Sequence, residues 1–182
     1  MQNLTTSATP PVPVQSVKLD QCANLAIITL AAPLVGANIS PILMSSASVP
    51  TTAMLNTYDT LDAYSTPFLA LTQGNQAQCQ AFNPQYSQYN MLCTQPVQGQ
   101  TITSDYLGGD PIIGFSVFNN TPSAVLVGIT GQYYSTFVFA QTGRDNDPGA
   151  YRFSALVAPS IGTIAAAAGV SAANLTNPNP LG

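Results

Sequence analysis

Histidine, glutamate and tryptophan are absent from the 182-residue sequence, and lysine occurs once, at Lys18. Catalysis usually needs a titratable group poised for proton transfer, and histidine is the commonest. The absence of histidine excludes every triad or dyad built on an imidazole, and a Ser–Lys mechanism would depend wholly on Lys18. A site of two carboxylates would need two aspartates, and we interpret the pair Asp59 and Asp62 as solvated. We therefore predict that the protein is not an enzyme and has no catalytic residues.

Signals for bound groups are equally scarce. No glycine-rich phosphate loop follows a predicted strand, so we expect no cofactor and no small-molecule ligand. No CxxC or Cys/His spacing occurs, which excludes a zinc site. Three basic and seven acidic side chains give a net charge of -4. Three basic groups cannot neutralise a run of phosphates, so nucleic acid is not the primary ligand.

Charge of either sign is scarce, at 5% of residues against a usual value of about 25%. The polar surface must therefore consist of Thr, Ser, Asn, Gln and backbone. A surface of this kind protects poorly against association. Two interpretations remain open: a secreted or adhesive protein solvated by hydroxyls or sugars, or a protein whose surface is covered by neighbouring copies of itself.

Much of the charge lies in one segment, Phe137–Phe153. It holds four of the ten charged residues, namely Arg144, Asp145, Asp147 and Arg152. We predict a hairpin whose charged tip is solvated by water or by a partner. Asp145 and Asp147 are spaced as at the start of a calcium loop. The twelfth position of such a loop is Leu156 instead of glutamate, so the pair is a weak calcium candidate and a turn is the simpler interpretation.

Three cysteines are present, at positions 22, 79 and 93. Three pairings are possible, each with one cysteine left over. Cys79 and Cys93 bracket a compact Gln/Tyr-rich loop, and closing a loop of about 15 residues contributes roughly 3 kcal/mol. We therefore choose Cys79–Cys93 as the disulfide candidate. The alternative is three buried thiols that act as small hydrophobes.

Short runs of β-branched and aromatic residues, bounded by Pro, Gly and Asn, predict about eight strands. The segments are 24–32, 41–48, 67–73, 89–97, 111–118, 123–130, 132–141 and 150–157. Ile113, Phe115 and Val117 fall on one face of their strand, and Gly131 indicates a bend or bulge. The predicted fold class is all-β: a single jelly-roll-like β-barrel or sandwich.

Helical patterns are few. Residues 51–65 have partial helical periodicity and are expected to form a short helix in a long connection. Residues 160–175 give the clearest helical pattern, with Ser160 as a plausible cap and Gly169 as the stop.

The chain divides into an extended, Pro-rich N-terminal arm (1–15), a β-barrel or sandwich body (16–159), and a short helix with a polar C-terminal tail (160–182). The arm is expected to matter for assembly and not for folding. The start of the sequence has no signal-peptide pattern. The longest mostly apolar run, 25–37, is too short to span a bilayer and is interrupted by Pro33.

The final segment, 164–182, resembles the central part of a LysM module, whose family binds N-acetylglucosamine polymers. The resemblance rests on an alanine-rich helix, a "GVS" turn and an "NP" loop. The strand that precedes these features in the family is missing, so LysM function is not the preferred interpretation.

The whole chain is similar in character to the single β-barrel coat proteins of icosahedral viruses, nearest to the smaller major capsid proteins of tailless, internal-membrane Thermus phages. The likeness rests on the Pro-rich arm, about eight strands, very low charge and the polar tail. It implies a jelly roll, a capsid role, a virion location, and partners that are copies of itself and other coat proteins. The alternatives are an extracellular or cell-surface adhesin or pilus-like subunit with an immunoglobulin-like sandwich, and a carbohydrate-binding module with a tyrosine platform.

Overall fold

The computed structural model describes residues 12–21, 23–35, 41–57, 69–89, 91–97, 109–118, 120–134, 151–177 and 181. The strands are β1 (Val14–Asp20), β2 (Leu25–Leu30), β3 (Leu43–Ser45), β4 (Leu55–Thr57), β5 (Leu69–Gln73), β6 (Met91–Pro96), β7 (Pro111–Phe118), β8 (Thr121–Tyr134), β9 (Tyr151–Leu156) and β10 (Thr176–Asn177). The helices are α1 (Gln76–Phe82) and α2 (Ile161–Ala168), with 3-10 turns at Ala158–Ser160 and Ala172–Asn174.

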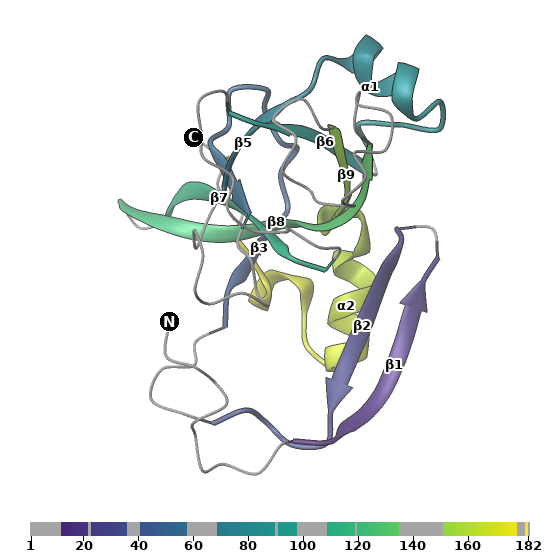
Figure 1. The fold of residues 1–182 in the computed structure, drawn as a ribbon. Coiled ribbons are helices and arrows are strands. Elements are labelled where there is room, and N and C mark those ends of the chain that lie inside the picture. Colours follow the sequence, from purple (N-terminus) through teal and green to yellow (C-terminus); the bar gives the residue numbers. More distant parts are fainter. Residues whose placement is uncertain are drawn as a thin grey trace.

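Six strands close into an antiparallel barrel (Figure 1). Around the ring the order is β8, β7, β4, β5, β6 and β9, and β9 pairs again with β8. Closure leaves none of these six strands at an open sheet edge. The predicted mostly-β barrel with a C-terminal helix is therefore confirmed. The sandwich alternative is wrong, because two separate packed sheets would leave the ring open.

Strand β8 closes the ring and is 14 residues long. Its first half pairs with β7 and, in parallel, with β3, whereas its second half pairs with β9. The register with β9 shifts between Ile129 and Gln132, so the bulge that Gly131 predicted is confirmed. A separate strand beginning at Gln132 is wrong, since Gln132–Tyr134 continue β8.

The barrel interior is filled by one apolar cluster. Its buried members are Ala53, Leu55, Leu69, Leu71, Leu92, Ile112, Val125, Val127, Leu156 and Leu181. Leu181 forms an isolated bridge with Ser116 of β7, so the end of the chain contributes to this cluster. On β7 the side of Ile112 and Gly114 faces the interior, and the apolar face that includes Val117 faces outward.

Two helices cover the outside of the barrel. Helix α1 is joined to β6 by the Cys79–Cys93 disulfide. Helix α2 places Ile161 in a second cluster with Met44 of β3 and Val157, and it also contacts β2. Gly169 ends α2 in the left-handed conformation, with φ of 67°, so the predicted helix stop is confirmed.

The hairpin of β1 and β2 is a separate two-stranded sheet that lies beside α2, away from the barrel (Figure 1). Val14, which the sequence assigned to the arm, is the first residue of β1. The main-chain amide of Ala31 donates to the carbonyl of Pro13, so pairing extends beyond the strand ends. Residues 1–11 lie outside the described part of the chain.

The helix predicted over residues 51–65 is wrong for the part that the structure describes, because Leu55–Thr57 form β4 between β5 and β7. Residues 58–65 lie outside the described residues. Hydrogen bonding to a strand on each side stabilises the extended conformation more than a partial helical periodicity favours a helix in so short a segment.

Conversely, helix α1 forms where the sequence suggested only a loop. Asn75 caps it by accepting a hydrogen bond from the amide of Ala77 at 2.9 Å.

Candidate functional site

The ionisable side chains are dispersed across the described residues, and none of these regions brings three potential metal ligands together. Lys18 is exposed on β1, and Asp110 is buried at the start of β7. Asp145 and Asp147, the weak calcium candidates, lie outside the described residues, as do Asp59 and Asp62. In the regions that are described, no helix is long and apolar enough to cross a membrane.

One serine does contact a carboxylate. The hydroxyl of Ser160 donates to Oδ2 of Asp20 at 3.0 Å, and Oδ1 of Asp20 accepts from the amide of Ala23 at 3.1 Å. Ser160 is buried at the start of α2 and makes no side-chain bond to that helix. The contact therefore fastens the β1–β2 hairpin to α2. A nucleophile of the trypsin type also needs a base between serine and aspartate, and no imidazole exists in this sequence.

The predicted disulfide is present between Cys79 of α1 and Cys93 of β6, whose Cα atoms are 6.3 Å apart. An aromatic cluster surrounds the bridge: Phe82 stacks on Tyr151, and Tyr86 meets Phe153 edge to face. Burial raises the pKa of the Tyr86 phenol above its usual value of about 10. These contacts serve packing.

The prediction that the charges of Phe137–Phe153 lie at a solvated tip is wrong for Arg152. Arg152 is only 2% exposed. The reason is its place within β9, where alternation puts it on the same side as Ser154 and Leu156, and Leu156 belongs to the interior cluster. Arg144, Asp145 and Asp147 lie outside the described residues, so the prediction stands untested for them.

Two hydroxyls inside the barrel are not satisfied. Thr94 Oγ1 and Ser154 Oγ are buried, and no hydrogen-bond partner is found for either within the structure described. They belong to the paired strands β6 and β9, on the interior side with Leu92 and Leu156. A buried hydroxyl without a partner costs roughly 1–3 kcal/mol.

We expect Thr94→Val to raise the free energy of unfolding by about 1 kcal/mol, because valine removes the unsatisfied hydroxyl and keeps the branched shape. Urea denaturation would measure the change. Thr57→Val is the matched control: Thr57 is equally buried, and its hydroxyl donates to the carbonyl of Pro111 at 3.1 Å, so its loss should destabilise by about 1 kcal/mol. A loss of stability in Thr94→Val would contradict the expectation.

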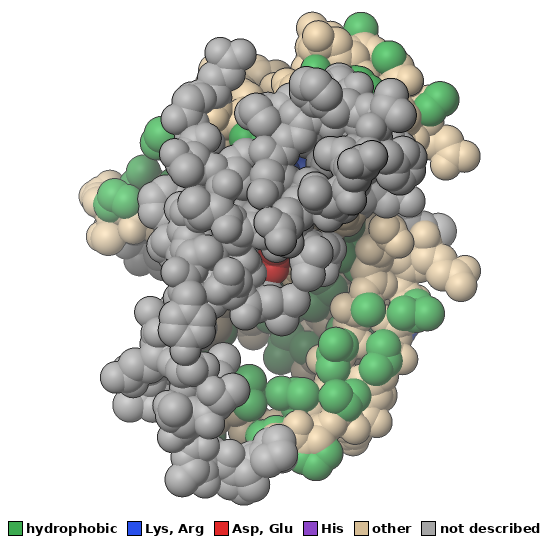
Figure 2. Space-filling view, viewed as in Figure 1, with side chains coloured by type: hydrophobic (Ala, Val, Ile, Leu, Met, Phe, Trp, Pro, Cys, Tyr) green, Lys and Arg blue, Asp and Glu red, His purple; other side chains and the backbone are tan. Residues whose placement is uncertain are grey.

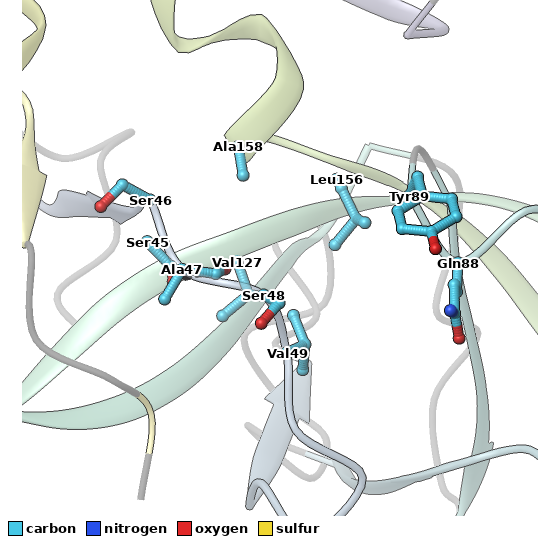
Figure 3. Close-up of a pocket in the computed structure, with 10 residues that line it drawn as sticks. All are labelled: Ser45, Ser46, Ala47, Ser48, Val49, Gln88, Tyr89, Val127, Leu156 and Ala158. Carbon is cyan, nitrogen blue, oxygen red and sulfur yellow. Dashed lines mark hydrogen bonds between the residues drawn. The ribbon is translucent and has the colours of Figure 1, made fainter.

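A small pocket of about 200 Å³ opens on the surface of the barrel (Figure 3). Its lining residues are Ser45, Ser46, Ala47, Ser48, Val49, Gln88, Tyr89, Val127, Leu156 and Ala158. The Ser45–Val49 segment stands on one side and Gln88 with Tyr89 on the other, with Leu156 between them (Figure 3). None of these described lining residues carries a charge.

The β1–β2 hairpin carries the most unusual surface. In an antiparallel pair, residues directly opposite each other share a face. One face of this hairpin contains three such pairs: Val17 with Ile28, Leu19 with Ala26, and Val14 with Leu30. The bulge between Val14 and Ser16 rotates Val14 onto this face. We call these six residues the outer hairpin face.

Every side chain of the outer hairpin face is apolar, yet most of them are exposed. The exposed fractions are 64% for Leu19, 58% for Ile28, 56% for Val17 and 55% for Val14. Figure 2 shows hydrophobic side chains along this hairpin. The opposite, inner face carries both charges of the hairpin, Lys18 and Asp20, and Asp20 is bonded to Ser160 of the body.

A two-stranded antiparallel sheet usually turns its more apolar face to the protein. Here the wholly apolar face is the exposed one, and the inner face combines Lys18 and Asp20 with the half-buried Leu25 and Ile27. The sequence did not predict this arrangement, because residues 24–32 were predicted as a strand but no strand was predicted over residues 14–20. The signal was the alternation in "VQSVKLD", which separates Val17 and Leu19 from Lys18 and Asp20.

No family model matches the chain, and no curated protein matches its sequence. Among solved structures, kallikrein-related peptidase 10 is similar, with a TM-score of 0.62 and 14% sequence identity over 86% of this chain and 72% of that chain. The fold is that of a trypsin-like serine protease. The six-stranded ring described above corresponds to one barrel of that fold. At 14% identity the likeness shows the fold alone.

This likeness overturns the resemblance to viral coat proteins. The expected jelly roll and the capsid role that it implied are wrong, as is the immunoglobulin-like sandwich of the alternative reading. The physical reason is that low charge, a Pro-rich start and about eight strands describe composition and element content. Neither of these fixes the order in which strands pair, and strand order distinguishes the all-β folds.

Proposed function

We propose that this protein is a non-enzymatic, protein-binding domain: a trypsin-like barrel that presents an apolar hairpin to another protein. The outer hairpin face carries the proposal. Three cross-strand pairs without a single polar side chain are exposed on one face, while the opposite face bonds to the body through Asp20 and Ser160. Exposed apolar patches of this kind mark interaction sites.

The proposal of a non-enzymatic role is supported by what trypsin-like catalysis requires. That chemistry needs an imidazole to take the proton of the serine hydroxyl and an aspartate to orient the imidazole. The chain contains no histidine. Its one described Ser–Asp contact, Ser160 with Asp20, is direct, and the serine is buried.

A fluorophosphonate probe tests this part of the proposal. We expect no labelling of the purified chain, and no hydrolysis of a mixed peptide library above the buffer rate, under conditions in which trypsin reacts fully. Ser160→Ala is the internal control, since it removes the only described serine hydroxyl that contacts a carboxylate. Hydrolysis by the chain, lost in Ser160→Ala, would show that the protein is an enzyme.

We also propose an oxidising location, such as the extracellular space. The support is the buried Cys79–Cys93 bridge, because disulfides persist mainly in secreted proteins and oxidising compartments. Alkylation of the protein as it is isolated from its natural source, followed by mass spectrometry, would test this. Recovery of Cys79 and Cys93 as alkylated thiols would contradict it.

A further inference from the structure

We infer that the partner of the outer hairpin face is a second copy of this chain, so that two hairpins stack face to face about a two-fold axis. This inference rests on the proposed protein-binding role. A two-fold contact uses the same patch on both subunits, so the patch must be complementary to itself. A face made only of aliphatic side chains meets this requirement, because apolar contact needs no matching donor or charge.

The charges of the hairpin support the same partner. Lys18 and Asp20 are both on the inner face, so two outer faces can meet without burying a charge or opposing like charges. Interface cores are depleted in charged residues for this reason. A charged partner would find no complementary charge on the outer hairpin face, because none of the six residues of that face is charged.

The outer hairpin face offers about two-thirds of the apolar area that one side of a standard interface buries. A Val, Leu or Ile side chain loses roughly 60–120 Å² of accessible surface on burial. Five such side chains and one alanine, about half exposed, therefore present on the order of 300 Å². A standard interface takes about 800 Å² from each partner, of which roughly 450 Å² is apolar. The outer hairpin face supplies most of that apolar share.

The central cross-strand pair gives the sharpest test. Val17 and Ile28 lie between the other two pairs, so in a two-fold stack they are close to the axis. In sedimentation equilibrium we expect the full chain to dimerise, and Val17→Thr with Ile28→Thr to raise the dissociation constant at least tenfold. Val117→Thr is the matched control, because Val117 is 54% exposed on the outside of β7.

A second measurement keeps the test independent of folding. Ile28→Cys in a Cys22→Ser background should form a covalent dimer on mild oxidation, whereas Val117→Cys should not. A chain that stays monomeric to about 100 µM overturns the inference, and so does a dimer that the double threonine variant leaves unchanged. Either result leaves the non-enzymatic role standing, which fails only if the chain hydrolyses substrate or reacts with the fluorophosphonate probe.

Discussion

Alanine at both Cys79 and Cys93 should lower the free energy of unfolding by about 3 kcal/mol, within a usual range of about 2–5 kcal/mol. The bridge joins residues 14 apart in sequence. Its loss gives the unfolded chain more conformations, which raises the entropy of the unfolded state and lowers the free energy of unfolding. The folded state also loses contacts, because both sulfur atoms are buried against Tyr151 and Phe153.

The structure explains why the effect should reach beyond the bridge. Helix α1 has only seven residues, and helices this short are not stable without tertiary contacts. Its buried residue is Cys79. Without the bridge, we expect amide hydrogen exchange to increase first in α1, and the stacked ring of Phe82 to leave Tyr151.

Urea denaturation of the double variant gives the free energy, and Cys22→Ala is the control because it removes a thiol and leaves the bridge intact. Equal losses in the two variants would contradict a specific role for the bridge. An unchanged free energy in the double variant would show that the aromatic cluster alone holds α1 in place.

Gly128→Ala should destabilise the protein by about 3 kcal/mol, at the upper end of the usual cost of overpacking. A Cβ atom at this position would lie 2.6 Å from the carbonyl oxygen of Ala155. The obstacle is backbone, so no side-chain rotation can relieve it. Gly128 pairs with Leu156 where β8 meets β9, which means that the clash falls on the contact that closes the barrel.

Gly162→Ala provides a matched control within the same chain. Gly162 lies in α2, and a Cβ atom there would meet no atom within 4 Å. Alanine should leave stability unchanged or raise it by up to about 1 kcal/mol, because glycine is the poorer helix former. Thermal unfolding of both variants measures the contrast. Equal melting temperatures would show that β8 and β9 can move apart slightly without a loss of stability.

Strand positions could be predicted where one segment carries its own signal. Pro111–Phe118 was identified with the bounds that β7 has, because β-branched residues and flanking turns are local properties. The face that β7 buries could not be predicted. Ile112 and Gly114 face the interior because Val127, Leu181 and Leu55 occupy the space above Gly114, and those neighbours come from distant parts of the chain.

The candidate site was harder to predict for the same reason. Its residues are ordinary aliphatic side chains, and only the pairing of β1 with β2 places them on one face. The direction of that face depends further on the contact between Asp20 and Ser160, which are 140 residues apart. Sparse charge indicated that some surface is covered by a partner, but it could not identify which surface.

The order of strands around the barrel has a consequence for how the chain folds. Closing the ring requires Leu55 to meet Gly114, and Thr94 to meet Arg152, so partners are separated by about a third of the chain. Each such pairing costs loop-closure entropy before it brings any contact energy. All-β domains with distant pairings fold on the millisecond-to-second scale, far more slowly than helical bundles. During that interval the Leu- and Val-rich strands of the barrel are unpaired, so refolding yield should depend on protein concentration.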